Sequence, residues 1–478
     1  MSHRTDPRRG HLPAVASLAL LAVLVVAACG PSNPSASPSA AATSTPAASA
    51  AVPSSSAAVS SGSANQAADA VYDAVEQQVI GIRGLKPSHP VERQFIDEAE
   101  LRTLLTQQFD KDTPPAYLAA NEQLYKALGL IPATTDLRDL SLDLLSGGVA
   151  GFYRSDEGKL YVVSKSGQPG PNERFYFSHE YNHALQDQNF TVFKDQDGVL
   201  DQSDRMLARA SVYEGDSTLL MTQWAAGNLS QADLLEVVAA GSDPAVQAVM
   251  DKTPAILSDT LTFPYTSGFG FVTAAQTKGG WPGVDALYAK MPASTEQILH
   301  ADKYAAGEAP IPVTLPTDLA SRMGAGWTVP LLDTFGEYQL SIWLKENGVP
   351  AADATTAAAG WGGDRLAVMQ GPDGAWAVAM DTEWDTEADA KEFEKAASNA
   401  VKKAGGVGQV LPGAGGTTRW VWPAEARGPS QPRLYIDSGA EIPSSVSAFD
   451  SVIRAASARA RRAAERSGSS GSTTRASR

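Results

Sequence analysis

His179, Glu180 and His183 form the motif H-E-x-x-H, within a stretch from Phe175 to Leu185 that contains no proline or glycine. On an α-helix, residues four apart lie on one face, one turn from each other, so both imidazoles can reach the same metal ion. Glu180 then lies beside the first ligand, where it can take a proton from a water that the metal activates. The motif predicts a catalytic zinc centre, and its alternative is a chance match on a core helix.

A catalytic zinc needs a third protein ligand and one position open to water. Glu214 is the candidate, on a helix predicted over Met206–Leu220. The glycine that follows it, Gly215, would let a second helix approach closely. A surface glutamate is the alternative. Asp187 and Asp216 compete with Glu214, either as ligands or as acceptors for the histidine N–H groups.

H-E-x-x-H followed by a helix that carries Glu214-Gly215 resembles the gluzincin group of zinc metallopeptidases, over roughly residues 151–304. The resemblance implies a zincin-like fold in which zinc is held by His179, His183 and Glu214 and the general base is Glu180. The string His-Glu-x-x-His-Ala-Leu-Gln-Asp-Gln is also similar to uncharacterised exported bacterial proteins with a peptidase-like domain, a similarity that gives no substrate.

Three features depart from the gluzincin pattern. The gap from His183 to Glu214 is longer than in thermolysin-like or aminopeptidase-N-like enzymes. Thr218 stands four positions after the glutamate ligand, where the thermolysin group has an acidic residue. The sequence has no G-x-M-E-N stretch of the aminopeptidase type, which argues against an aminopeptidase.

A hydrolytic site also needs a hydrogen-bond donor for the oxyanion of the tetrahedral intermediate. The segment Phe263–Phe271 resembles the P-Y-x-x-G segment that carries the transition-state tyrosine of aminopeptidase-N-like enzymes, so the resemblance points to Tyr265. His300 is a second candidate, because thermolysin-like enzymes use an imidazole. The alternatives are a core or capping tyrosine and a packed or surface histidine.

A β-hairpin is predicted directly before the motif, from Val149–Arg154 and Lys159–Val163, because aromatic residues flank a turn that ends at Gly158. In zincin peptidases an edge strand at this place lies along the cleft, and extended substrate pairs with it. The resemblance implies the same role here, with an ordinary hairpin as the alternative.

The remaining elements predict an α+β protein. Before the hairpin, helices are expected over residues 67–82, from Asp97 as N-cap, and over 117–128 and 136–145, with a strand at 93–96. Beyond residue 312, strand pairs alternate with helices, and residues 331–344 have a helical pattern. We therefore expect a largely helical zincin-like metallopeptidase domain over 66–312 and a small α+β module over 313–464.

The N-terminal region predicts export. Arginines precede a short apolar run, and Val26-Ala27-Ala28-Cys29 resembles the lipobox of bacterial lipoproteins. That resemblance implies a signal peptide over residues 1–28 and lipid on Cys29, with an uncleaved anchor helix as the alternative. Residues 29–65 are almost all Ser, Ala, Pro, Thr and Gly, which predicts a disordered tether. Residues 465–478 predict a disordered tail.

Net charge excludes one class of partner. The chain carries −15, and residues 1–28 hold three arginines and one aspartate, so the chain from Cys29 onward carries −17. Such an acidic protein is not expected to bind nucleic acid. Cys29 is the only cysteine, so no internal disulfide can form.

Together these patterns predict a zinc metallopeptidase that a lipid at Cys29 anchors on the outer face of the cytoplasmic membrane. Its partners would be a peptide or protein substrate and the membrane. The alternative is a non-catalytic surface lipoprotein that uses the same scaffold to bind a partner or a cell-wall component. The presence of Glu180 argues against it, because a decayed site usually loses its base first.

Overall fold

The computed structural model describes residues 61–421, apart from the segments 147–150, 164–168, 191–198, 373–375, 404–408 and 413–416 and the single residues 243 and 324. The predicted signal peptide, Cys29, most of the predicted tether and the predicted tail lie outside the described residues. Among the helices of the described part, none combines the length and the apolar character that a membrane crossing requires.

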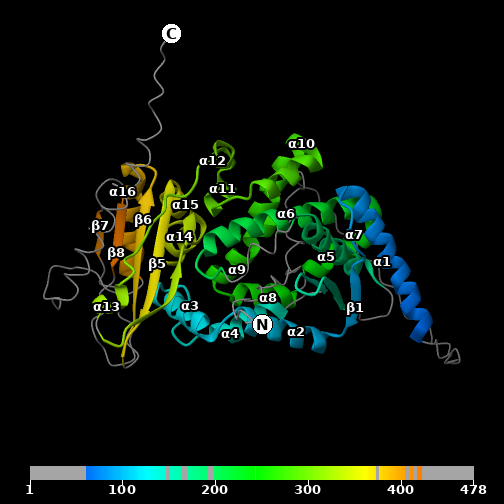
Figure 1. Cartoon of the computed structure of the whole chain (residues 1–478), viewed down its shortest axis with the longest axis horizontal. Coiled ribbons are helices and arrows are strands. Elements are labelled where there is room, and N and C mark those ends of the chain that lie inside the picture. Colours follow the sequence, from blue (N-terminus) through cyan, green and yellow to red (C-terminus); the bar gives the residue numbers. More distant parts are fainter. Residues whose placement is uncertain are drawn as a thin grey trace, which may run out of the picture.

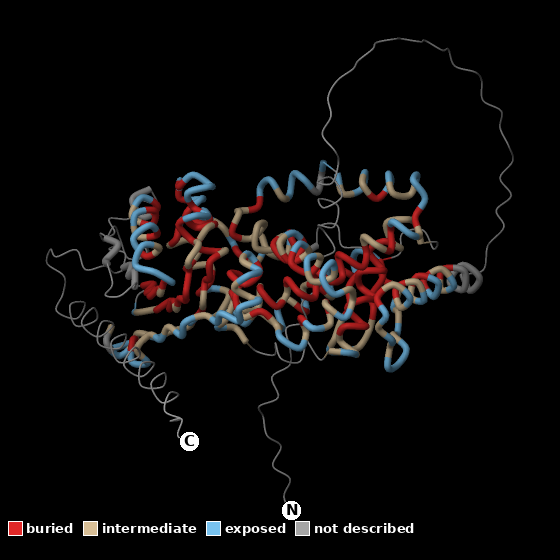
Figure 2. The backbone as a smooth tube through the Cα atoms, turned by 90° about the horizontal axis from the view of Figure 1, so that it is seen from above, coloured by how far each residue is buried: buried red, intermediate tan, exposed pale blue. Residues whose placement is uncertain are grey.

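The protein is a mixed α+β structure, mostly helical, with two small sheets. Figure 1 shows one sheet and α1 (Ser61–Arg83) at one end of the molecule and the second sheet at the other end, with helices between them. Residues 61–65, which lie at the end of the predicted tether, are the first residues of α1. In Figure 2 the buried residues gather in the interior and the exposed ones lie along the outer helices.

The first sheet confirms the predicted hairpin. Its strands are β1 (Glu92–Ile96), β2 (Gly151–Arg154) and β3 (Lys159–Val163), in the order β1-β3-β2. β3 pairs with β1 in parallel and with β2 antiparallel, so β2 is an edge strand. Between β1 and β2 run α2 (Glu98–Asp112), α3 (Pro115–Ala127) and α4 (Leu137–Ser146), and Asp97 caps α2 as predicted.

Two buried helices occupy the centre of the molecule. They are α5 (Pro171–Phe190), in which every residue from Phe175 to Gln186 is buried, and α6 (Ser203–Asn228). Apolar residues of both helices pack in one cluster with α1 and β3. Because α5 is buried on all sides, its polar side chains must find partners inside the protein.

The helices that follow α6 build the rest of the central region. They are α7 (Gln231–Gly241), α8 (Pro244–Lys252), α9 (Ala255–Phe263), the π-helical segment η4 (Pro264–Gly268), α10 (Phe269–Ala289), α11 (Thr295–Leu299) and α12 (Ala301–Ala306). The segment η4 packs against α6. Single π-helical turns inside helices occur often at functional sites.

The second sheet is antiparallel throughout, in the order β4-β5-β6-β8-β7. Its strands are β4 (Thr328–Asp333), β5 (Trp361–Gln370), β6 (Trp376–Trp384), β7 (Gln409–Pro412) and β8 (Thr417–Val421), and its helices are α13 (Leu319–Met323), α14 (Gly336–Glu346), α15 (Ala351–Ala358) and α16 (Glu387–Lys403). The core between this sheet and α14–α16 also contains residues of α3 and α9, so it is shared across the predicted boundary at residue 312.

The helix predicted over residues 331–344 begins later in the structure than predicted. Residues 331–333 end strand β4 rather than begin a helix, and α14 starts at Gly336. The cause is tertiary: β4 pairs with β5, and Asp364 of β5 accepts the backbone N–H groups of Phe335 and Gly336 at 2.8 and 2.7 Å. Gly336 has φ +75°, a conformation that favours glycine and interrupts the helical pattern.

The same corner of the second sheet holds the N-terminus of α6. The first residue of this helix, Ser203, donates its backbone N–H and its hydroxyl to Asp333 at 2.7 and 2.5 Å. A carboxylate at this place satisfies free N–H groups and favours the positive end of the helix dipole. The C-terminal sheet therefore caps the helix that carries Glu214.

Candidate metal centre

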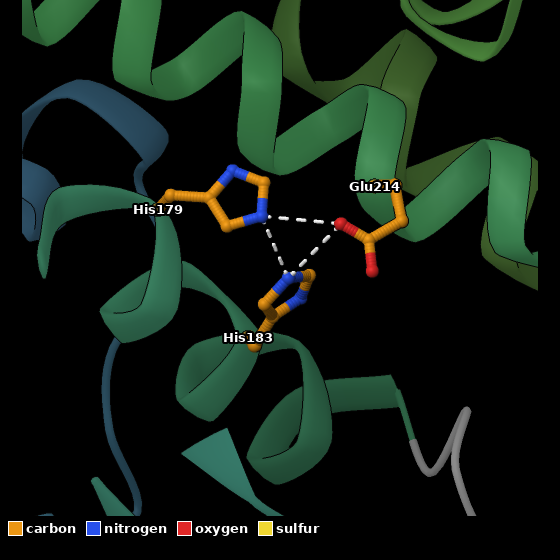
Figure 3. A group of neighbouring side chains, drawn as sticks. All are labelled: His179, His183 and Glu214. Carbon is orange, nitrogen blue, oxygen red and sulfur yellow. Dashed lines mark hydrogen bonds and ion pairs between the residues drawn. The ribbon is translucent and has the colours of Figure 1, made fainter. Parts of the chain in front are cut away.

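His179, His183 and Glu214 converge on one point, as Figure 3 shows. Nε2 of His179 lies 3.0 Å from Nε2 of His183 and 3.1 Å from Oε2 of Glu214. Nε2 of His183 lies 3.4 Å from the same carboxylate oxygen. The two histidines extend from α5 and the glutamate from α6, so the structure brings together the three ligands predicted from separate helices.

The spacing and chemistry of these atoms fit a metal ion. Four ligands at about 2.0–2.1 Å in a tetrahedron lie about 3.3 Å from each other. The three distances above fall around that value. Two imidazoles and one carboxylate are an established set for catalytic zinc. The side chains of all three residues are buried, so the group could hold a metal ion shielded from bulk water.

Burial and the neighbouring charges shift the pKa of each of the three residues. Burial opposes protonation of His183, but Glu214, with smaller contributions from Glu180 and Gln186, raises the pKa of His183 to about 9. Burial would raise the pKa of Glu214, but the two imidazoles, His183 foremost, lower it to about 2. Burial and then the neighbouring His183 lower the pKa of His179.

Glu180 lies beside this group and is equally buried. Its Oε2 accepts the backbone N–H of Tyr153, on edge strand β2, at 3.0 Å, and its Oε1 has no hydrogen-bond partner among the described residues. Burial, with the charge of Glu214 also contributing, raises the pKa of Glu180 to about 8. A carboxylate with a pKa near neutrality is suited to accept and return a proton.

Space for a water molecule exists next to Glu180. A cavity of about 10 Å³ is lined by Glu180 and Phe177 of α5 and by residues of the β2–β3 hairpin. About this volume is needed for one water molecule. Glu180 therefore borders a space large enough for one water molecule, and its Oε1 has no hydrogen-bond partner among the described residues.

Tyr265 belongs to the same group. It lies in η4, is buried, and its ring centroid is 6.1 Å from that of His179. Its phenol is hydrogen-bonded to Glu214, and burial followed by the charges of Glu214 and Glu180 keeps its pKa well above the usual value. Tyr265 therefore keeps its proton and can act as a hydrogen-bond donor at the centre.

Two glycines allow Tyr265 to come this close. A Cβ on Gly215 would lie 2.5 Å from the carbonyl oxygen of Gly268, and a Cβ on Gly268 would collide with the backbone of Ser211. Real Cβ atoms do not approach so closely, so α6 and η4 can pack here only without side chains. This confirms the close approach expected from the glycine after Glu214.

The structure does not place His300 with these residues. His300 lies between α11 and α12, and its Nε2 is 2.9 Å from Oε1 of Glu337 on α14. The hydrogen bond with Glu337 raises the pKa of His300, against the effect of partial burial. The structure thus pairs the His300 ring with Glu337 of α14 and not with His179, His183 or Glu214.

Asp187 and Asp216 contact other side chains. Asp216 accepts Nε of Arg83 at 2.9 Å and the hydroxyl of Tyr288 at 2.6 Å. Asp187 accepts the hydroxyl of Tyr153 at 2.8 Å. Neither is in the converging group. On a helix, Asp216 is about 200° away from Glu214, so the two point in different directions.

The residue that sequence reasoning missed is Gln186. Its Oε1 lies 2.8 Å from Nδ1 of His183, whereas the sequence offered Asp187 and Asp216 as alternative acceptors for the histidine N–H groups. A signal was available, because residue 186 is three positions after His183 and such pairs share a helix face.

A second convergence of acids is not comparable to the first. Glu296, Glu308 and Asp385 also approach each other, with Glu308 and Asp385 exposed. They surround the ammonium of Lys303, which lies 2.6 Å from Glu296 and 3.0 Å from Glu308 and also contacts Asp385. This group is an ion-pair cluster that joins α11 and α12 to the end of β6.

Comparisons with known proteins add little to this geometry. A family model described as a domain of unknown function (DUF8575) matches residues 328–438, which include the second sheet but none of the three ligands. No curated protein matches the sequence. A crystal structure from Chloroflexus aurantiacus, described as a proposed hydrolase with a novel fold, is 15% identical over 51% of this chain and 89% of that chain, with a TM-score of 0.32. A TM-score this low carries no argument about function.

Proposed function

We propose that the protein is a zinc-dependent metallopeptidase of the gluzincin type. The observation that supports the proposal is the approach of His179, His183 and Glu214 to within 3.0–3.4 Å of each other in a buried site that also contains Glu180. The donor set is one of those used by hydrolytic zinc enzymes, and a zincin-like fold of the central region is part of the same proposal.

His179, His183 and Glu214 would hold zinc. Zinc, when bound, supplies a Lewis acid that polarises the scissile carbonyl and makes water more acidic. Glu180 takes a proton from the attacking water at its unpartnered oxygen and passes this proton to the leaving amine. Tyr265 donates its phenol O–H to the oxyanion, a role that its raised pKa permits.

Extended substrate would lie along β2. This strand pairs with β3 on one side only, and the backbone N–H of Tyr153 on the other side points to Glu180. The ligands and Glu180 are at most 2% exposed, so a peptide reaches them only if a neighbouring element moves from its described position. A peptide that adds to β2 would compete with Glu180 for this N–H and thereby release the base.

The proposed site of action is outside the cell. The sequence features that support it are the lipobox-like Val26–Cys29, the low-complexity segment that follows, and the acidic charge of the rest of the chain. Cys29 would carry the lipid that anchors the protein on the outer face of the cytoplasmic membrane. The substrates would then be extracytoplasmic peptides or proteins.

The proposal is tested with Glu180→Gln in the full chain. We expect this variant to bind zinc as the wild type does and to hydrolyse casein at least about 100-fold more slowly, because it lacks only the base. Removal of zinc by a chelator should abolish wild-type hydrolysis, and zinc should restore it. Full hydrolysis by Glu180→Gln would contradict the assigned base, and zinc binding without any hydrolysis by the wild type would favour a non-catalytic binding protein.

A further inference from the structure

The amide of Gln186 connects the two helices of the metal centre. It is completely buried on α5, with its Oε1 2.8 Å from Nδ1 of His183. Its Nε2 donates to the backbone carbonyl of Tyr213 at 2.9 Å and to the hydroxyl of Ser217 at 3.0 Å, both on α6. A single side chain thus contacts one ligand and the helix that carries another.

The two anchors of Gln186 lie on either side of Glu214 in the sequence. Tyr213 immediately precedes Glu214, and Ser217 follows one turn later. The amide therefore fixes the distance between the His183 ring and the turn of α6 that presents Glu214. Because both helices are buried here, a change in this contact cannot be compensated by water without opening the core.

The orientation of the amide follows from its partners. A backbone carbonyl can only accept, so the NH₂ group of Gln186 must face Tyr213 and its oxygen must face His183. That oxygen can only accept, so Nδ1 of His183 must carry a hydrogen. The lone pair of the neutral ring is then on Nε2, the atom that lies 3.0 Å from His179 and 3.4 Å from Glu214.

We propose that Gln186 is a positioning residue of the metal centre, which selects the Nδ1–H tautomer of His183 and holds its ring in register with Glu214. The inference rests on the proposed zinc site. It replaces the expectation that an acidic residue performs this task. A carboxylate at this position would still accept from Nδ1–H, but it would place a second acceptor against the Tyr213 carbonyl.

Three variants of the full chain separate positioning from packing. Gln186→Met keeps the volume but removes all three polar contacts, and Gln186→Glu keeps the acceptor for His183 but loses the donor to Tyr213 and Ser217. Asn182→Ala is the matched control: Asn182 is a buried amide on the same helix that donates to the same Ser217 at 3.0 Å, without a hydrogen bond to either histidine ring.

The measurements are zinc affinity by chelator competition, the visible spectrum of the Co²⁺-loaded protein and the thermal midpoint. We expect Gln186→Met to bind zinc about 10- to 100-fold more weakly and to alter the Co²⁺ spectrum. Gln186→Glu keeps the acceptor for Nδ1–H but loses the donor to α6, so it should lose zinc affinity by a smaller factor than Gln186→Met, and its midpoint should fall. Asn182→Ala should lose thermal stability and keep zinc affinity.

Several outcomes would overturn the inference. They are wild-type zinc affinity in Gln186→Met, an equal loss of affinity in Asn182→Ala, or a loss in Gln186→Glu as large as in Gln186→Met. If Gln186→Met fails to fold, the zinc affinity of Gln186→Glu decides, and a Gln186→Glu protein with wild-type affinity would overturn the inference. A wild type that binds no zinc would instead contradict the proposed function, so the two failures are distinguishable.

Discussion

Gly215 and Gly268 meet where α6 and η4 approach most closely, and neither position has room for a side chain. The first glycine follows the ligand Glu214, and the second lies three residues after Tyr265. The contact therefore sets how far the phenol lies from the metal ligands. It links the packing of two helices to the chemistry of the site.

Gly215→Ala should separate these helices. The new methyl group would meet backbone atoms of Gly268, which cannot rotate away, so we expect a loss of about 1–3 kcal/mol in the free energy of unfolding and a lower kcat. Gly227→Ala is the matched control, because Gly227 is on the same helix with no atom within 4 Å of its added Cβ. That change should stabilise the protein by about 0.5–1 kcal/mol. Equal effects of the two substitutions in urea denaturation would contradict the account.

Tyr265→Phe should slow hydrolysis without loss of metal. Removing a donor to the oxyanion costs about 100-fold in kcat, whereas zinc is held by other residues. His300→Ala provides the comparison, because His300 pairs with Glu337 and should leave both zinc content and kcat near wild type. Steady-state kinetics on a peptide library would show the contrast, and a larger kcat loss in His300→Ala than in Tyr265→Phe would reverse the assignment.

Zinc affinity should depend on pH through His183. Burial lowers the pKa of His183, but the charges of Glu214 and Glu180 and the hydrogen bonds with Glu214 and Gln186 together raise it to about 9. Below that pH a proton must leave before the imidazole can bind metal, so the apparent affinity should rise about tenfold per pH unit between pH 6 and 8. Chelator competition at several pH values measures this slope. An affinity that stays constant over the range would show that no proton is displaced.

We expect the free energy of unfolding to fall as the pH rises from about 4 to 6, because the Asp333 carboxyl at the N-terminus of α6 loses its proton in this range. Burial raises the pKa of Asp333 to about 6, above its value in the unfolded chain. The folded state therefore binds this proton more tightly, and the resulting stabilisation, complete below about pH 4, is lost by about pH 6. Asp333→Asn cannot titrate there, so the wild type should lose stability relative to the variant from pH 4 to 6. A difference in urea denaturation that is the same at every pH would contradict the prediction.

The sequence predicted those features that are set by residues near each other in the chain, and it missed features that depend on distant partners. The spacing of His179 and His183 and the cap at Asp97 are set by helix geometry, and both were predicted. The cap of α6 by Asp333 was not, because the two partners are 130 residues apart and meet only through the second sheet. The strand at residues 331–333 was missed for the same reason, since its pairing with β5 overrides a helical pattern.

Among the residues of the candidate site, too, local patterns were predicted and distant partners were missed. Glu214 and Tyr265, each predicted from a short pattern that contains a glycine, do lie close to each other in the structure, while the role of Tyr265 stays a prediction. Gln186 was not predicted, and helix periodicity alone turns Asp216, one of the predicted competitors, away from Glu214. His300 could not be excluded from sequence, since its partner Glu337 lies on a distant helix.

The central claim is that His179, His183 and Glu214 hold one zinc ion. Its most direct test is zinc content, measured by mass spectrometry on the purified full chain of the wild type and of His183→Ala. The account predicts a single zinc per wild-type chain and none in the variant. A wild type without zinc, or a variant that retains as much as the wild type, would contradict it.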